Sequence, residues 1–260
     1  MKRSRIIILA LLLSIAIMVV LVTRDVITSN YLANKGKSDL NDANAKIALI
    51  DSGANLKDVN YDKSVKISKY NVLNDSENIT DNNKRGTIIF SALYNDKYSM
   101  NKKNDVLIIK AFESGNEIDA NNVAKALNYA CDNKVDVINL SFGLPDNENV
   151  KSAVESCEFK GATIIAMNDD KNSITFPASI KGVVSVSLTN DAVKTDVKVD
   201  SSQQEVCIKN KCHRNKNIAL STAYVTGYLI DYKNKEEVIK NLILKPSYSI
   251  DAEKNDEEKN

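Results

Sequence analysis

Short apolar runs alternate with amphipathic segments over much of the chain, and this alternation limits the fold more than any other feature. The runs lie at residues 46–50, 106–112, 135–142 and 162–167. The segments at 86–93, 119–130 and 150–157 carry apolar residues three and four positions apart. Such runs are typical of strands buried on both faces, and such segments of helices that cover them. The predicted fold class is α/β, with a mostly parallel sheet covered by helices on both faces.

The pattern changes after Pro177. A further strand is predicted at 183–188, followed by short β stretches through residue 208. An apolar helix is predicted from 218 to 232 and a short one over 236–244. Most of the last residues, DAEKNDEEKN, are charged, which predicts a disordered tail over 247–260.

Residues Ile6 to Val22 form an apolar run that only Ser14 interrupts. At 1.5 Å per residue, a helix of this length spans about 26 Å, enough for a thin bilayer. A cleaved signal peptide is the alternative, but the run exceeds the usual apolar region of about 7–15 residues and lacks a small-residue cleavage site. Three basic residues precede the run and only Arg24 closely follows it, which predicts a cytoplasmic N-terminus.

The expected localisation is therefore a single-pass anchor in the plasma membrane with an extracytoplasmic domain. The predicted parts are the cytoplasmic tip and anchor (1–23), a polar linker (24–43), the folded domain (44–246) and the tail (247–260). The membrane is thus one predicted partner.

An extracytoplasmic compartment permits disulfide bonds. Cys207 and Cys212 flank IKNK between predicted strands, which indicates a hairpin closed by a bridge. Cys131 and Cys157 lie near the ends of two consecutive predicted helices and can pair if those helices pack together. The alternative for this second pair is two free thiols in the core.

Charge and histidine content exclude several classes of function. The formal net charge is +1, so the chain lacks the basic surface that a nucleic-acid partner needs. Its single histidine, His213, excludes any site built on two imidazoles. No cysteine or histidine spacing indicates zinc, and no metal or cofactor is predicted.

Polar residues follow three predicted strands, where α/β sheets place their ligands. They are Asp51 after the first strand, Ser141, Phe142 and Gly143 after the third, and Asn168, Asp169 and Asp170 after the fourth. Taken singly, each group is better explained by a turn, a cap or a loop.

Six segments, taken in order, resemble the subtilisin-like serine peptidases, the subtilase family. They are ALIDSGA (48–54), KRGTIIFSAL (84–93), KVDVINLSFG (134–143), KGATIIAMNDD (160–170), ITFPASIKGVVSVSLTN (174–190) and NIALSTAYVTG (217–227). The segment at 134–143 is the most specific of them, and it resembles the strand that lines the family's substrate cleft. The resemblance implies a subtilisin-like domain of reduced size, with Ser141, Phe142 and Gly143 in the cleft.

The resemblance also implies a role for single positions. Asp51 matches the family's catalytic aspartate. The neighbouring glycine and threonine place Arg85 at the histidine position, and the downstream valine and glycine place Ala219 at the nucleophile position. The oxyanion asparagine corresponds to Asp170 without a gap, or to Asn168 if two residues are deleted.

These replacements remove the family's chemistry. Alanine has no hydroxyl to attack a carbonyl. Arginine cannot act as a base, because its guanidinium stays protonated. An aspartate in place of the oxyanion amide would repel the developing charge instead of stabilising it by roughly 3 kcal/mol. We expect Arg85 to pair with Asp51 instead, since a guanidinium matches a carboxylate.

A shifted site is the remaining route to hydrolysis. Ser221 follows Ala219 by two positions, which in a helix turns it about 200° away. His213 would have to reach a serine from the predicted hairpin, with a carboxylate to orient it. The sequence thus favours a membrane-anchored pseudoprotease that binds a peptide or protein without cutting it, in a sequestering, immunity or partner-regulating role. The alternatives are an active serine endopeptidase with a rearranged site and a surface scaffold without a peptide ligand.

Overall fold

A computed structural model describes residues 45–94, 104–113, 115, 117–192, 194–199, 205–208, 211–214, 217–230 and 242–244. The predicted anchor, linker and tail lie outside these residues. Within the described part of the chain, no helix is long and apolar enough to cross a membrane.

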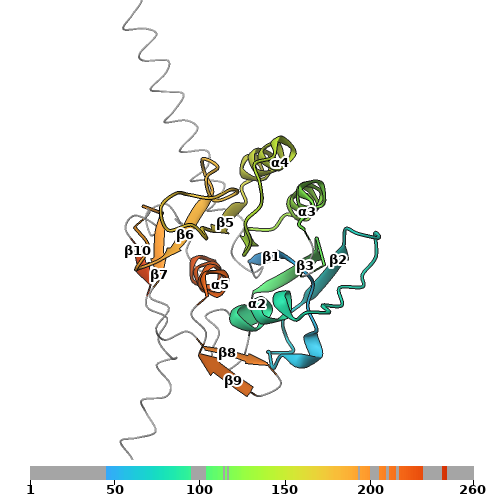
Figure 1. Cartoon of the computed structure of the whole chain (residues 1–260). Coiled ribbons are helices and arrows are strands. Elements are labelled where there is room, and N and C mark those ends of the chain that lie inside the picture. Colours follow the sequence, from blue (N-terminus) through green and yellow to red (C-terminus); the bar gives the residue numbers. More distant parts are fainter. Residues whose placement is uncertain are drawn as a thin grey trace, which may run out of the picture. The chain divides into compact units, whose positions relative to one another are not determined.

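An eight-stranded sheet in the order β10-β7-β6-β5-β4-β1-β3-β2 forms the centre of the domain, and every neighbouring pair is parallel (Figure 1). The strands are β1 (Lys46–Asp51), β2 (Ile67–Asn71), β3 (Asp105–Lys110), β4 (Val137–Leu140), β5 (Thr163–Met167), β6 (Val184–Leu188), β7 (Val197–Val199) and β10 (Leu242–Leu244). The predicted α/β class with a parallel sheet is confirmed.

Helices cover both faces of the sheet. One face carries α3 (Ala120–Asp132) and α4 (Glu148–Phe159), and the other carries α2 (Arg85–Tyr94) and α5 (Ile218–Leu229) (Figure 1). A short 3-10 turn, η1 (Leu56–Asp58), follows β1 in the chain. Alternate residues of β1 divide between the two cores. Ala48 and Ile50 face α3 and α4, whereas Ile47 and Leu49 face α2 and α5. This alternation explains why an unbroken apolar run forms the strand, because neither face meets water.

A disulfide joins Cys131 of α3 to Cys157 of α4, with 5.3 Å between the two Cα atoms. Both cysteines are buried and lie in the last turns of their helices. The predicted pairing of these helices is therefore confirmed, and free core thiols are excluded for this pair.

The second cysteine pair lies in an antiparallel hairpin formed by β8 (Glu205–Ile208) and β9 (Lys211–Arg214). Its register sets Cys207 opposite Cys212, as the sequence predicts. Their side chains lie outside what the structure describes, so the bridge between them stays a prediction.

Two elements differ from the sequence prediction. The helix predicted over 236–244 is wrong at its end, because Leu242–Leu244 is a strand that pairs with β7. Three apolar residues in a row fit either state, and the pairing with a distant strand decides between them. The strand β2 was not predicted from the sequence. It lies at the sheet edge, and most of its side chains are partly or fully exposed.

Candidate functional site

The polar residues predicted to form a site come together at the carboxyl edge of three neighbouring strands. Asp51 ends β1, Ser141 follows β4 and Asn168 follows β5, and these strands are adjacent in the sheet. Arg85 begins α2 and Ala219 lies in the first turn of α5. Parallel strands bring such residues to one edge however far apart they lie in the sequence.

Asp51 and Arg85 form the ion pair that the sequence predicts. The Asp51 side chain is only 1% exposed, and its Oδ2 contacts an Nη atom of Arg85. Its Oδ1 accepts the backbone N–H of Ser52 at 2.8 Å. Burial raises the pKa of Asp51, while the charge and hydrogen bond of Arg85 and the Ser52 N–H oppose the rise. The carboxylate thus depends on Arg85 to remain ionised inside the domain.

Arg85 also reaches the predicted cleft. Its second Nη donates to the backbone oxygen of Ser141 at 2.5 Å, and its Cζ lies 5.5 Å from the ring centroid of Phe112. Phe112 packs in turn against Phe142, with the ring centroids 5.1 Å apart. One guanidinium therefore joins the end of β1 to the segment that follows β4.

The Ser141 hydroxyl joins the same segment to α5. It donates to the backbone oxygen of Ala219 at 2.9 Å and accepts from the Asn139 side-chain amide at 2.8 Å. Asn139 is fully buried in β4 and accepts from Thr226 of α5 at 2.9 Å. Asp51, Arg85, Ser141 and Ala219 are thus brought together, as the sequence predicts.

The Ser221 side chain bonds within its own helix, α5. It is fully buried, and its Oγ donates to the backbone oxygen of Asn217, four residues earlier in the same helix, at 3.2 Å. Asn217 caps the helix through its side chain, which accepts the N–H of Ala219 at 2.8 Å. His213 lies in β9, and its side chain is outside the described part of the structure. The contact described for Ser221 is therefore a structural one, within its own helix.

The two candidates for the oxyanion position serve their own loop. The Asn168 amide donates to the backbone oxygen of Asp170, and its Oδ1 accepts the N–H of Thr175 at 2.8 Å. The Asp170 carboxylate accepts the N–H of Asn172 at 2.7 Å, and this bond and that from Ser173 hold the pKa of Asp170 below its usual value. Both side chains stabilise a turn after β5.

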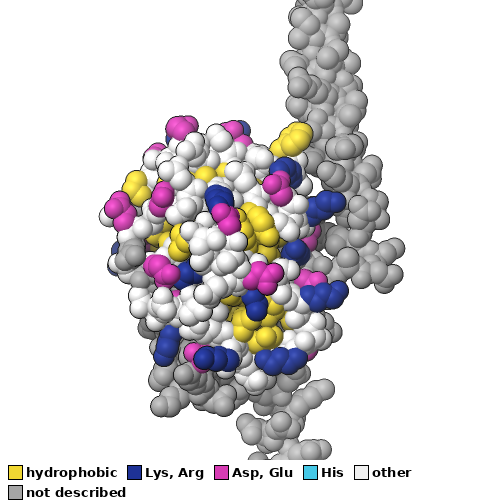
Figure 2. Space-filling view, turned by 90° about the vertical axis from the view of Figure 1, so that its right-hand side faces the viewer, with side chains coloured by type: hydrophobic (Ala, Val, Ile, Leu, Met, Phe, Trp, Pro, Cys, Tyr) yellow, Lys and Arg dark blue, Asp and Glu magenta, His cyan; other side chains and the backbone are white. Residues whose placement is uncertain are grey.

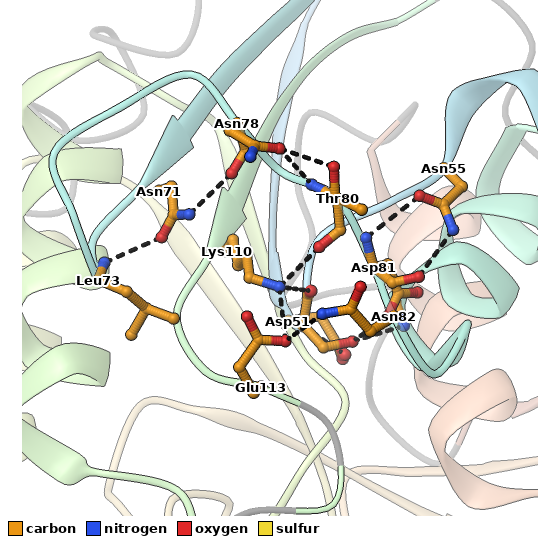
Figure 3. Close-up of polar contacts among 12 residues, drawn as sticks. Asp51, Asn55, Asn71, Leu73, Asn78, Thr80, Asp81, Asn82, Lys110 and Glu113 are labelled. Atoms are coloured by element: carbon orange, nitrogen blue, oxygen red, sulfur yellow. Dashed lines mark hydrogen bonds and ion pairs between the residues drawn. The ribbon is translucent and has the colours of Figure 1, made fainter.

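Lys110 and Asp81 support the end of β1, and sequence analysis missed both. Lys110 is only 3% exposed, and its Nζ donates to the backbone oxygens of Ser52 at 3.0 Å and Thr80 at 2.7 Å and pairs with Glu113 at 3.0 Å (Figure 3). Asp81, also buried, accepts from the Ser52 hydroxyl at 3.1 Å. A lysine ending an otherwise apolar strand was the available signal for Lys110.

Asp81 also fixes the start of α2. Its Oδ2 accepts the N–H of Thr87 at 2.8 Å and the Thr87 hydroxyl at 2.6 Å. A Cβ on Gly86 would overlap the backbone oxygen of Gly53, so only glycine allows the helix to approach β1 this closely. Gly53 itself has a φ of 101°, which strains any other residue. Arg85 is therefore held beside Asp51 by its neighbours as well as by its charge.

Replacing Lys110 by methionine tests this support. We expect Lys110→Met to lower the free energy of unfolding by about 2 kcal/mol, because the oxygens of Ser52 and Thr80 would lose their donor. Urea denaturation of the full chain measures the change. Lys125→Met is the matched control, since Lys125 pairs with Asp75 on the surface and should change stability by less than about 0.5 kcal/mol. Equal effects of both variants would contradict this role of Lys110.

The face that carries β2, α3 and α4 is separate from this site. A shallow groove of about 630 Å³ lies there, with Tyr70, Lys125, Tyr129 and Asn149 among its lining residues. Figure 2 shows acidic, basic and hydrophobic side chains interspersed over this side of the domain. None of the residues around Asp51 lines the groove. Among the described residues, no group of three or more histidine, cysteine, aspartate or glutamate side chains is placed to hold a metal ion.

Comparison with known proteins gives a consistent result. Residues 42–238 match the model of the subtilase family, peptidase S8. A cell wall-associated protease of Bacillus subtilis (strain 168) is 31% identical over 171 residues, which are 62% of this chain and 19% of that protein. The chain thus spans about a fifth of the length of this curated relative.

Solved structures share the fold. A cold-adapted subtilisin-like serine proteinase has a TM-score of 0.63 and 17% identity, covering 73% of this chain and 77% of its own. The epidermin leader peptide processing serine protease of Staphylococcus aureus has a TM-score of 0.58 and 19% identity, covering 76% of this chain and 67% of its own.

Proposed function

Because the chain belongs to the subtilase family, we propose that it is a pseudoprotease of that family, which binds a peptide or protein in its cleft without cutting it. The observation that carries this proposal is the position of Arg85. Its guanidinium occupies the place beside Asp51 where the family resemblance expects an imidazole, and it bonds to both Asp51 and Ser141. A guanidinium that stays charged cannot remove a proton from a nucleophile.

The nucleophile position supports the same proposal. Ala219 lies in the first turn of α5 and has no hydroxyl, while the hydroxyl of Ser221 bonds back along its own helix. The nearby amide of Asn168 is engaged within the loop after β5. Acyl transfer needs both a nucleophile and a base to activate it, so the loss of these two leaves no route to an acyl-enzyme.

Peptide binding is supported by the segment after β4. The backbone groups of Phe142 and Gly143 have no hydrogen-bond partner among the described residues, and Gly143 is partly exposed. An extended peptide can pair with such a segment as an added strand. The membrane anchor of the proposal rests on the apolar run at residues 6–22 and its basic flank.

A fluorophosphonate probe, which reacts with activated serines, tests the loss of activity. We expect no covalent labelling of the full chain purified in mild detergent, and no hydrolysis of casein, under conditions that label an active subtilase completely. Ala219→Ser should remain unlabelled as well, because the serine would have no base beside it. Labelling of the wild-type chain that disappears in Ser221→Ala would overturn the proposal in favour of a peptidase with a rearranged site.

A further inference from the structure

We propose that the cleft receives the free C-terminal carboxylate of its peptide, and that Arg85 binds it. This inference rests on the proposed peptide-binding function and names the class of ligand. It predicts a preference for peptide ends over internal segments of proteins.

The unused donors of Arg85 are the first reason. A guanidinium has five N–H donors in a planar fork that fits a carboxylate. Within the described chain, Arg85 makes two hydrogen bonds, to Asp51 and to the Ser141 backbone oxygen. Its side chain is 28% exposed, whereas that of Asp51 is 1% exposed. Three N–H donors of the guanidinium thus have no partner among the described residues, and the side chain is partly exposed.

The hydrogen bond between Arg85 and the Ser141 backbone oxygen is the second reason. A peptide that continued past this point would present an N–H to the backbone of the segment after β4. The Ser141 oxygen already accepts from Arg85, so that N–H would compete for the second lone pair right beside the positive guanidinium. A peptide that ends here presents a carboxylate to the same guanidinium, and a charge-assisted bond replaces the mismatch.

Apart from Asp51, which pairs with Arg85, the neighbouring elements bear on the charge that a ligand can carry here. The first turn of α5 lies beside Ser141, because the Ser141 hydroxyl donates to Ala219, and this turn contains no acidic residue. The start of a helix carries partial positive charge, which adds to that of Arg85. On the other side, the Asp169 carboxylate lies 3.2 Å from the position that a Cβ on Gly143 would take. Asp169 disfavours a second acidic group next to the carboxylate.

A pair of peptide libraries tests this inference. Random octapeptides labelled with fluorescein at the N-terminus are prepared with a free C-terminal carboxylate and, separately, with a C-terminal amide. Binding of each library to the full chain in mild detergent is measured by fluorescence anisotropy. We expect the amidated library to bind at least tenfold more weakly, because it cannot form the charge-assisted bonds.

The outcomes separate this inference from the proposed function. If both libraries bind equally, peptide binding stands and the carboxylate site is refuted. If neither library binds, peptide binding and the carboxylate site both fail. The comparison uses the unmodified chain and therefore does not depend on whether any variant folds.

The double variant Asp51→Asn with Arg85→Gln assigns the preference to Arg85. It removes both charges and keeps polar groups at both positions, so it should retain the circular dichroism spectrum. It should also abolish the difference between the two libraries. Lys125→Gln removes one positive charge from α3 and should leave the difference intact. A preference that survives in the double variant would refute the role of Arg85.

Discussion

Arg85→Met is expected to lower the free energy of unfolding at neutral pH by about 3 kcal/mol. The substitution leaves the Asp51 carboxylate buried without its cation, and breaking a buried pair from one side costs about 3–5 kcal/mol. The lower end applies because Arg85 is itself partly exposed. Urea denaturation of the full chain, followed by circular dichroism, measures the loss.

A double-mutant cycle separates the ion pair from the other contacts of Arg85. Asp51→Asn removes the buried charge, so Arg85→Met should cost at least about 1 kcal/mol less in that background than in the wild type. The contacts of Arg85 with Ser141 and Phe112 are lost equally in both backgrounds. An identical cost in both would show that these contacts, and not the charge of Asp51, account for the loss.

The effect of Arg85→Met should also depend on pH. Burial already raises the pKa of Asp51 above its ordinary value of 3.8, and losing the opposing guanidinium raises it further. The folded protein then binds a proton more readily than the unfolded chain, so lowering the pH from neutral toward 3.8 stabilises the folded variant. The deficit should be smaller at about pH 5 than at about pH 7. A deficit that grows on acidification would contradict a buried, unpaired Asp51.

The fold could be predicted for strands and helices whose apolar residues follow a recognisable pattern. Strands buried on both faces, such as β1 and β3, read as unbroken apolar runs, and α3 shows the spacing of a helix with one buried face. The edge strand β2 has neither pattern, because most of its side chains meet water. The strand β10 depends on pairing with β7, about 45 residues earlier in the chain, which no local pattern records.

The candidate site, like the fold, could be predicted only in part from the sequence. Asp51, Arg85, Ser141 and Ala219 could be assigned because ordered motifs fixed their positions, and their side chains or backbones meet in the structure. The support from Lys110 could not be predicted, since its partners are backbone oxygens of a loop whose path follows from the tertiary fold. The engagement of Asn168 within its own loop has the same origin.

Removing the disulfide between α3 and α4 is the second large effect that we expect. The bridge closes a loop with a sequence separation of 26, and the chain-entropy relation assigns such a loop about 3.5 kcal/mol. The double variant Cys131→Ala with Cys157→Ala should lower the free energy of unfolding by about that amount, as measured by urea denaturation without reductant. Both thiols are buried, so the alanines also leave small cavities that add to the loss.

The control for this prediction uses the other cysteine pair. A reductant acts on any disulfide, including the predicted bridge between Cys207 and Cys212, whose short loop is worth roughly 2 kcal/mol by the same relation. Cys207→Ala with Cys212→Ala removes that contribution, so reducing this variant should reproduce the loss assigned to the bridge between α3 and α4. If reductant leaves its stability unchanged, the two helices are held together by packing alone. A loss that matches the wild type's would show instead that Cys207 and Cys212 contribute no bridge.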